Sequence, residues 1–445
     1  MSLKKPKIKA VLVGVQTQEV SDADFESSLA ELGRLAKTLG VEVIARLTQK
    51  REFIDASVLG HGKRFELARL TGGNGVTPRG PPAQRQKMED AAKLAMGELL
   101  LELGEPDELA NLVIVDASLT PAQIGNLSRA AGTEVTDRAG IIIDIFHRHA
   151  STREARLQVE IARLKYLAPR MRAGGGASER QAGKGAGESS LELDRRKVRD
   201  RISELSRELA SIESHANMRR SRREDTLRVA LVGYTNAGKS SWMRKLSIAS
   251  VLVEDKLFAT LDTTVRELSP KVIPQILVSD TVGFIQQLPH DLVASFRSTL
   301  EEAKEASLLL HVVDASDPAF EAQLEVTREV LAEIDALEGR NMLIFNKMDC
   351  CDAERRAMLA ERWPDAVQVS AKNPEDVTRL HALIVADFDH LLQDLELVVP
   401  YDQSALIGEV HKRARVLSED FEDDGVHYTL KLAADDAAHL KSLLK

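Results

Sequence analysis

The chain has 445 residues, enough for about three domains of ordinary size. Hydrophobic residues make up 43% of it and charged residues 29%, as in a globular protein, and no apolar run approaches the roughly 18 residues that a membrane helix needs. These values exclude a membrane-spanning protein. The net charge of −9, taken over the whole chain, argues against a nucleic-acid partner, because phosphate binding requires clustered Lys and Arg.

The amino terminus and the cysteines indicate the cellular compartment. The first residues lead from a basic patch into a β-like stretch without a small-residue cleavage site, so we expect no secretory signal. Cys350 and Cys351 are adjacent and can form neither a disulfide framework nor, on their own, a metal site. We therefore expect a cytoplasmic protein, and we expect it to act as a monomer.

Residues 1–146 alternate β-like runs with helical patterns, which predicts an N-terminal α/β domain. The β-like runs are residues 8–15, 41–47, 112–115 and 141–145. Apolar residues recur every three or four positions over 24–39 and predict a helix, and an amphipathic helix is predicted over 83–103. Turn-forming residues predict a loop over 71–82.

Residues 147–225 have the pattern of an antiparallel, coiled-coil-like helical hairpin. In its first arm, Leu157, Ile161 and Leu164 recur at helical spacing. The second arm carries a narrow apolar seam, made by Val198, Ile202, Leu205, Leu209 and Ile212. Between the arms, residues 173–189 are Gly-rich and without apolar content, which predicts a flexible loop.

This hairpin is the basic part of the chain. Residues 148–225 contain 19 Lys and Arg against 12 Asp and Glu, a net charge of +7, which leaves −16 for the remainder. Composition alone leaves two interpretations open. The charges either lie on the solvated faces of a hairpin with a plain linker at its tip, or they bind an anionic partner.

Residues 226–397 alternate strand-like runs with helical patterns, including helices after Ser240 and from Pro289. This alternation is typical of a doubly wound, mainly parallel sheet. The pattern of residues 398–445 predicts a helix over 404–413, a hairpin with Asp424 and Gly425 at its turn, and a final helix. We interpret this end of the chain as a small α+β C-terminal subdomain.

A complete P-loop motif, G-x-x-x-x-G-K-[ST], stands directly after a strand-like run and before a helical pattern. It consists of Gly233, Tyr234, Thr235, Asn236, Ala237, Gly238, Lys239 and Ser240. The backbone N–H groups of such a loop wrap the β-phosphate of a nucleotide. We expect Lys239 to bridge the β- and γ-phosphates and the Ser240 hydroxyl to bind Mg²⁺.

A second motif, D-x-x-G, ends the strand-like run ILVSD, and it consists of Asp280, Thr281, Val282 and Gly283. Asp280 is predicted to hold Mg²⁺ through a water molecule. The N–H of Gly283 can approach the γ-phosphate, because no side chain hinders it.

Two further motifs, N-K-x-D and S-A-K, indicate the base. They consist of Asn346, Lys347, Met348, Asp349, Ser370, Ala371 and Lys372. The Asp349 carboxylate can accept from both N1–H and the exocyclic amine of guanine, whereas adenine offers no such pair, so GTP is predicted rather than ATP. We expect Asn346 to support the loop and the purine edge, Lys347 to lie along the base, and the Ala371 N–H to donate to guanine O6.

A switch threonine should respond to the γ-phosphate, and the residues themselves do not decide among Thr260, Thr263 and Thr264. The motifs become more specific together with FATLD, DTVGFIQQLPHDLVASFRSTLEE, TEVTDRAGIIIDIFHRHASTREARLQVEIARLKY and GESSLELDRR. With these stretches, the chain resembles the HflX family of translational GTPases from about Val11 to its C-terminal tail.

This resemblance implies a nucleotide-binding switch loop formed by Phe258, Ala259, Thr260, Leu261 and Asp262. It also implies that Thr260 binds Mg²⁺, which makes Lys239, Thr260 and Gly283 the candidate catalytic residues. Further, it implies association with the large (50S) ribosomal subunit and its rRNA, and splitting or rescue of stalled ribosomes. The +7 hairpin then has a candidate anionic target.

Three positions carry separate expectations. Phe284 stands where some GTPases have a water-orienting glutamine, so slow intrinsic hydrolysis is expected. Asn236 is either an ordinary P-loop side chain or, as the likeness to potassium-dependent GTPases implies, a residue that helps to hold K⁺. Residues 60–63, GHGK, form either a structural turn at a helix start or a phosphate-contacting turn at which the N-terminal domain binds ATP.

These observations predict a Mg²⁺-dependent GTPase that associates with the large ribosomal subunit. One alternative is a GTPase that acts on another RNA particle. The other is a nucleotide-dependent RNA-remodelling protein that uses ATP at its N-terminal domain and has the G domain as a regulatory module.

Overall fold

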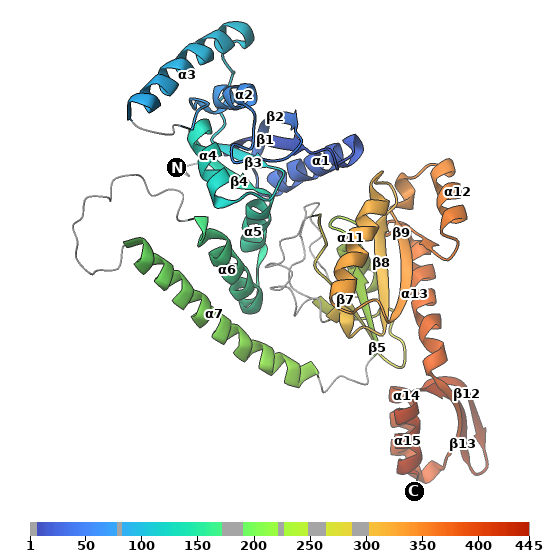
Figure 1. Ribbon diagram of the computed structural model, residues 1–445. Coiled ribbons are helices and arrows are strands. Elements are labelled where there is room, and N and C mark those ends of the chain that lie inside the picture. Colours follow the sequence, from blue (N-terminus) through green and yellow to red (C-terminus); the bar gives the residue numbers. More distant parts are fainter. Residues whose placement is uncertain are drawn as a thin grey trace, which may run out of the picture. The chain divides into compact units, whose positions relative to one another are not determined.

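The computed structural model describes residues 7–77, 82–170, 190–220, 227–247, 264–286 and 302–444 (Figure 1). These residues fall into two compact units. The first contains the described residues up to Glu213 together with Gln286, and the second contains the others. Three predicted features, the Gly-rich loop at 173–189, the FATLD loop at 258–262 and the helix from Pro289, lie outside the described residues.

Among the described residues, a four-stranded parallel sheet forms the centre of the first unit. Its strands are β1 (Lys9–Gln16), β2 (Glu42–Lys50), β3 (Leu112–Val115) and β4 (Glu134–Asp137). They lie in the order β2-β1-β3-β4. β1 and β3 are buried almost without interruption, as expected for parallel strands covered on both faces. The α/β class predicted for this part of the chain is confirmed.

Helices surround this sheet, and side-chain caps fix where several of them begin. They are α1 (Asp22–Thr38), α2 (His61–Thr71), α3 (Pro82–Leu103), α4 (Pro121–Ala131) and α5 (Arg138–His149). The Ser21 side chain accepts from the N–H of Asp24 at the start of α1, and Thr120 and Gln123 form a capping box at the start of α4. α1 and α3 confirm the helices predicted at 24–39 and 83–103.

The run at 141–145 is helical, so its prediction as a strand is wrong. Ile141, Ile142, Ile143 and Ile145 all lie in α5 and are buried. Because this helix is buried on several sides, it needs apolar residues at nearly every position, and such a run cannot be told from a strand by periodicity. The preceding strand β4 ends at Asp137, whose carboxylate accepts from the Gly140 N–H (2.9 Å) and caps α5.

Helices α6 (Arg153–Leu167) and α7 (Ser190–Arg220) pack through the apolar positions that the sequence pattern indicated. The contact is made by Leu157, Ile161, Leu164, Ile202, Leu205, Leu209 and Ile212. An ion pair between Arg153 and Glu208 (2.6 Å) joins the first residue of α6 to the second half of α7.

A six-stranded sheet forms the centre of the second unit in its described part. Its strands are β5 (Leu227–Val232), β6 (Thr264–Glu267), β7 (Ile276–Asp280), β8 (Leu308–Asp314), β9 (Arg340–Asn346) and β10 (Val367–Gln368). They lie in the order β10-β9-β8-β5-β7-β6, and β6 is antiparallel to β7 while the other neighbours are parallel.

Helices cover both faces of this sheet (Figure 1). They are α8 (Lys239–Leu246), α11 (Phe320–Glu333), α12 (Ala353–Arg362) and α13 (Pro374–Phe388), with the short 3₁₀ helices η3 (Met348–Cys350) and η4 (Asp389–Leu391). Ile344 of β9 packs with α8 and α13, whereas Phe345 packs with α11 and α12. The predicted doubly wound, mainly parallel sheet is confirmed.

The last part of the described chain contains an antiparallel sheet of β11 (Gln393–Val399), β12 (Arg415–Glu422) and β13 (Gly425–Leu432). The 3₁₀ helix η5 (Tyr401–Gln403) leads into α14 (Ser404–Arg413), and α15 (Ala434–Leu443) follows β13. Val410 and Leu440 of the two α-helices pack with the sheet. No helix among the described residues is long and apolar enough to cross a membrane.

Candidate functional site

The motifs of the second unit meet at one edge of the six-stranded sheet. Gly233 follows β5, Asp280 ends β7, Asn346 ends β9 and Ser370 lies just after β10. Parallel strands have their carboxyl ends on the same edge, which is where open α/β sheets bind ligands. The structure therefore brings together the P-loop, D-x-x-G, N-K-x-D and S-A-K, while Thr260 and its loop lie outside the described residues.

Two glycines give the P-loop its path. Gly233 has φ +146°, and a Cβ there would lie 2.2 Å from the Val312 carbonyl oxygen. Gly238 has φ +100°, and a Cβ there would lie 2.1 Å from Nδ2 of Asn346. Both distances are far too short for any side chain, so glycine is required at each position. The loop leads into the N-terminus of α8, whose backbone N–H groups attract anions.

Lys239 places a buried ammonium inside this loop. Its Nζ donates to the carbonyl oxygens of Gly233 (2.9 Å) and Tyr234 (2.8 Å), and the residue is 6% exposed. Burial lowers the pKa of Lys239 to about 8, and the nearby Asp280 carboxylate opposes this shift. The loop thus combines a positive charge with a helix N-terminus, the two features that bind a polyphosphate.

Ser240 and Asp280 supply adjacent oxygen atoms at the same edge. The Ser240 hydroxyl donates to Oδ2 of Asp280 at 2.7 Å, and Asp280 is 1% exposed. Hydroxyl and carboxylate oxygens are hard ligands of the type that Mg²⁺ prefers, directly or through water. The donor set therefore fits the metal that the sequence predicted at Ser240.

Gly283 and Phe284 lie against the P-loop. A Cβ on Gly283 would be 2.9 Å from Cα of Thr235 and 3.0 Å from Nζ of Lys239, so D-x-x-G approaches the loop closely. The Phe284 N–H donates to Gly233 (3.2 Å), and its carbonyl accepts from the Thr235 N–H (2.8 Å). The Phe284 side chain is buried. Its backbone thus joins the D-x-x-G segment to the P-loop, and its side chain packs in the interior.

Asn346 connects the base-recognition loops to the P-loop. Its Nδ2 donates to the Ala237 carbonyl (2.7 Å), and its Oδ1 accepts from the Ala371 N–H (3.3 Å). The residue is 2% exposed. The predicted support of the loop by Asn346 therefore has a concrete geometry, in which the side-chain amide spans two motifs.

Asp349 is held as an ionised carboxylate. Lys372 Nζ donates to its Oδ2 (2.7 Å), and the Ser370 hydroxyl donates to its Oδ1 (2.6 Å). Hydrogen bonds from Lys372 and Ser370 lower the pKa of Asp349 to about 2. Oδ2 also accepts a weak hydrogen bond from the Cys350 thiol (3.6 Å). A guanine N–H can replace this weak donor and another can use the second lone pair of Oδ1, so the group can accept the two N–H donors of a guanine.

The remaining predicted residues have different surroundings. Thr281 is fully buried and its hydroxyl donates to the Leu231 carbonyl (2.8 Å), and Met348 packs in the core between β9 and α12. Asn236 has φ +62°, an unusual value for a residue other than glycine. Val282 is buried, whereas Lys372 is exposed.

Sequence reasoning missed residues that support the base-recognition loops. Asp314 pairs with Lys347, Asp376 accepts from the Ser370 N–H (2.9 Å), and Arg356 donates to the Met348 carbonyl (2.6 Å). Asp314 ends β8, and this position at the carboxyl edge of a buried strand was the signal that could have found it. The other two lie in the helical segments α12 and α13 and carry no such signal.

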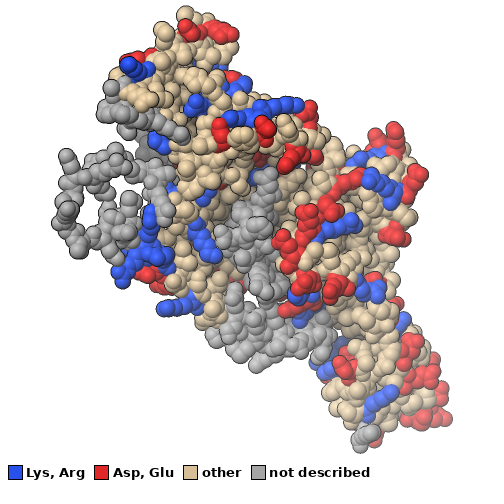
Figure 2. All heavy atoms as spheres, viewed as in Figure 1, with Lys and Arg blue, Asp and Glu red and all other residues tan. Residues whose placement is uncertain are grey.

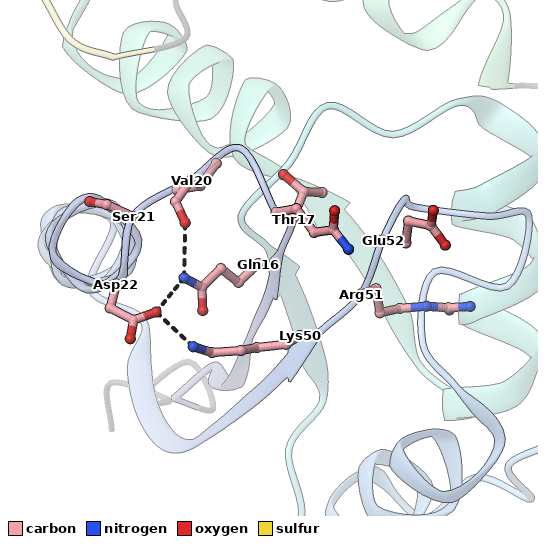
Figure 3. A pocket seen from close by; sticks show the side chains of 9 residues that line it. Gln16, Thr17, Val20, Ser21, Asp22, Lys50, Arg51 and Glu52 are labelled. Carbon is pink, nitrogen blue, oxygen red and sulfur yellow. Dashed lines mark hydrogen bonds and ion pairs between the residues drawn. The ribbon is translucent and has the colours of Figure 1, made fainter.

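The first unit contains a cavity of about 420 Å³ at the ends of β1 and β2 (Figure 3). Across it, Asp22 Oδ1 accepts from Gln16 Nε2 (2.7 Å) and Lys50 Nζ (2.7 Å). The hydrogen bond from Lys50 lowers the pKa of Asp22 most, and the hydrogen bond from Gln16 lowers it further. The carboxylate and the ammonium thus partner each other, and the cavity points to no particular ligand.

Residues 60–63 begin a helix. Gly60 caps α2, which starts at His61, and its N–H donates to Oε1 of Gln49 (2.8 Å). Lys63 Nζ pairs with Glu66 one turn later (2.7 Å). These contacts are those that a structural helix start makes, and the alternative, a phosphate-contacting turn at which the N-terminal domain binds ATP, stays a prediction.

Three family models match the chain. The GTP-binding GTPase N-terminal model covers residues 66–147, the GTP-binding GTPase middle-region model covers 149–223, and the 50S ribosome-binding GTPase model covers 228–347. They follow one another along the chain and together span more than half of it.

Curated relatives align over nearly the full length. The GTPase HflX of Gluconacetobacter diazotrophicus is 57% identical over 98% of this chain and 98% of its own. The GTPase HflX of Escherichia coli is 35% identical over 94% of this chain and 91% of its own. A crystal structure of a GTP-binding protein from Sulfolobus solfataricus in complex with GDP covers 85% of this chain and 98% of its own, with 21% identity and a TM-score of 0.43.

Proposed function

Because this chain belongs to the HflX family of GTP-hydrolysing enzymes, we propose that it couples a Mg²⁺-dependent GTP cycle to association with the large ribosomal subunit. The converging P-loop and base-recognition loops of the second unit are the observation that carries this proposal. The expected outcome of the cycle is the splitting or rescue of stalled ribosomes.

In this proposal, the phosphates lie in the P-loop. The backbone from Gly233 to Ser240 surrounds the β-phosphate, and Lys239 contacts the β- and γ-phosphates from inside the loop. The Gly283 N–H contacts the γ-phosphate, since its Cα already lies against Thr235 and Lys239. Binding a polyphosphate replaces the carbonyl partners of Lys239 with phosphate oxygens.

Ser240 and Thr260 would hold Mg²⁺, with Asp280 acting through water, and the bound metal would supply positive charge at the β- and γ-phosphates. In the structure the Ser240 hydroxyl donates to Asp280, and these two side chains would hold the metal, Ser240 directly and Asp280 through water. Thr260 is assigned from the family resemblance alone.

Guanine is recognised by Asp349, whose charge Lys372 and Ser370 maintain, with Lys347 along the base. The Ala371 N–H lies 3.3 Å from Oδ1 of Asn346, so Asn346 holds this segment of backbone close to the expected position of the base oxygen. An adenine in the same place offers no donor pair to Asp349.

Hydrolysis by the isolated protein is slow in this account. The buried Phe284 cannot orient a water molecule, so that task falls to another group, which the ribosome supplies or brings into place. We further propose that Asn236 of the P-loop helps to hold K⁺, a role that its likeness to the asparagine of potassium-dependent GTPases implies.

The helical hairpin is the proposed rRNA-binding element. The packing of α6 on α7, with Arg153 joined to Glu208, supports an antiparallel arrangement of two arms. The exposed basic residues of α7 include Arg196, Lys197, Arg199, Arg201 and Arg207. Figure 2 shows blue side chains gathered over this helix, whereas red ones predominate over the β12–β13 hairpin. Clustered arginines and lysines provide the electrostatic part of RNA binding.

We propose four domains along the chain: 1–146, 147–225, 226–397 and 398–445. Because β11 begins at Gln393 and pairs with β13, the last boundary is better placed just before Gln393. A protein that binds the large ribosomal subunit must be in the compartment that contains ribosomes, so we propose a cytoplasmic location. We also propose that the protein acts as a monomer.

The proposal is tested by measuring GTP turnover of the full chain with and without purified 50S subunits. We expect about tenfold or greater stimulation, because a missing water-positioning group is supplied in trans. Absence of stimulation would remove the ribosomal role while leaving the GTPase activity in place.

A pair of variants assigns the stimulation to the hairpin. Replacing Arg196, Lys197 and Arg199 by alanine should reduce stimulation by 50S subunits and leave intrinsic turnover unchanged, because these side chains are exposed on α7. The matched control replaces Lys87 and Lys93, which are exposed on α3. If both variants behaved alike, the hairpin would have no special part in binding.

A further inference from the structure

Lys347, the lysine of N-K-x-D, is restrained at both its backbone and its side chain. Its backbone has φ +60°, in the left-handed region that residues with a side chain rarely adopt. Its Nζ forms an ion pair with Oδ2 of Asp314 at 2.6 Å. The two side chains are only 28% and 14% exposed, so solvent screens this pair less than a surface salt bridge. A strained backbone that the surroundings maintain often marks a functional position.

Asp314 is itself rigidly placed. It is the last residue of β8 and stands directly opposite Asn346, the last residue of β9, in the parallel ladder. Its Oδ1 accepts from the backbone N–H (3.1 Å) and the hydroxyl (2.6 Å) of Ser316. Both oxygens of the carboxylate are therefore engaged, one by its own loop and the other by Lys347.

We propose that Asp314 is a positioning residue for the guanine base and acts through Lys347. By holding the ammonium, it fixes the four-carbon stem of Lys347 beside the base-recognition loop before the nucleotide arrives. A lysine side chain that is already ordered loses little conformational freedom when a base packs against it, which increases affinity. This inference rests on the proposed binding of guanine at Asp349.

The binding constant of GDP separates positioning from a purely structural ion pair. In Asp314→Asn, the amide cannot hold the ammonium by charge, and we expect the Kd for GDP to rise by about tenfold, the order expected when a lysine side chain must be ordered on binding. The melting temperature measured without nucleotide should change little. The matched control is Asp317→Asn in the same loop, whose carboxylate accepts from Ala319 and Gln323 and does not contact Lys347.

A double-mutant cycle with Lys347→Met shows whether Asp314 acts through the lysine. We expect Asp314→Asn to have no further effect on the GDP Kd once Lys347 is replaced. An effect of the same size in both backgrounds would overturn the proposal, as would an unchanged Kd in the single variant. Asp314→Glu keeps the charge and should restore most of the affinity, which provides a second test if the asparagine variant folds poorly.

The same assay separates this inference from the proposed function. The wild-type chain should bind GDP far more tightly than ADP. If it does, and Asp314→Asn leaves the Kd for GDP unchanged, only the proposed role of Asp314 is refuted. If the wild-type chain does not prefer GDP, guanine recognition at Asp349 fails, and the role of Asp314 fails with it.

Discussion

Nucleotide binding at the P-loop should take up protons near pH 8, and Lys239 is the reason. Its ammonium is buried, and burial lowers its pKa to about 8 in the nucleotide-free site. A polyphosphate beside the ammonium favours the charged form and should restore a pKa above about 10, close to the ordinary value for lysine. A proton is therefore bound together with the nucleotide wherever Lys239 starts out neutral.

The size of the effect follows from these two pKa values. At pH 8 about half of the Lys239 side chains are neutral before binding, so about 0.5 proton per nucleotide should be taken up, against about 0.1 at pH 7. Because the charged form binds, the affinity is fully present well below pH 8 and is lost as the pH rises through the pKa of about 8. The fall amounts to about a factor of two between pH 7 and pH 8.

Isothermal titration calorimetry with GDP and Mg²⁺ measures this uptake directly, since the observed heat varies with the ionisation enthalpy of the buffer. The matched control is Lys372→Gln. The pKa of Lys372 is raised by its hydrogen bond to Asp349, so this side chain stays charged throughout and its removal should leave the uptake unchanged. Uptake near zero at pH 8 in the wild-type chain would refute the reasoning, because Lys239 would then be fully charged before binding.

Three other changes have defined outcomes. Asp349→Asn replaces two acceptor oxygens by one acceptor and one donor, so competition binding should show at least about tenfold loss of preference for GTP, and an unchanged preference would contradict guanine recognition at this residue. Arg138→Met removes the guanidinium that neutralises the buried carboxylates of Glu31 and Asp116, which should lower the free energy of unfolding of the first unit by about 3–5 kcal/mol in urea denaturation. A loss under about 1 kcal/mol would contradict the burial of Arg138, Glu31 and Asp116, because only solvent-exposed ion pairs contribute so little. GTP turnover should be several-fold faster in K⁺ than in Na⁺ if Asn236 helps to hold the cation, and equal rates would exclude that role.

The P-loop could be predicted from sequence because its geometry is local. Gly233 and Gly238 lie within six residues of each other, and the positive φ values that they adopt are a property of the motif itself. The helix over 141–145 was missed for the opposite reason. Its isoleucines are buried by contacts with other segments, and a short β-branched run has the same composition in a buried helix as in a strand.

Contacts between distant residues could not be predicted. Asp314 and Lys347 are 33 positions apart, and they meet only because β8 and β9 are neighbours in a particular register. Arg138 pairs with Glu31 across 107 positions for a similar reason. Sequence patterns identify strand ends as places for polar chemistry, but the order of the strands decides which ends are adjacent.

Co-sedimentation of the full chain with 50S subunits tests the central claim most directly. Three parallel samples contain GTP, a non-hydrolysable GTP analogue and GDP. The account predicts strong co-sedimentation with the analogue, less with GTP as it is hydrolysed, and least with GDP. Equal binding in all three states would contradict it, because the nucleotide would then control nothing on the ribosome.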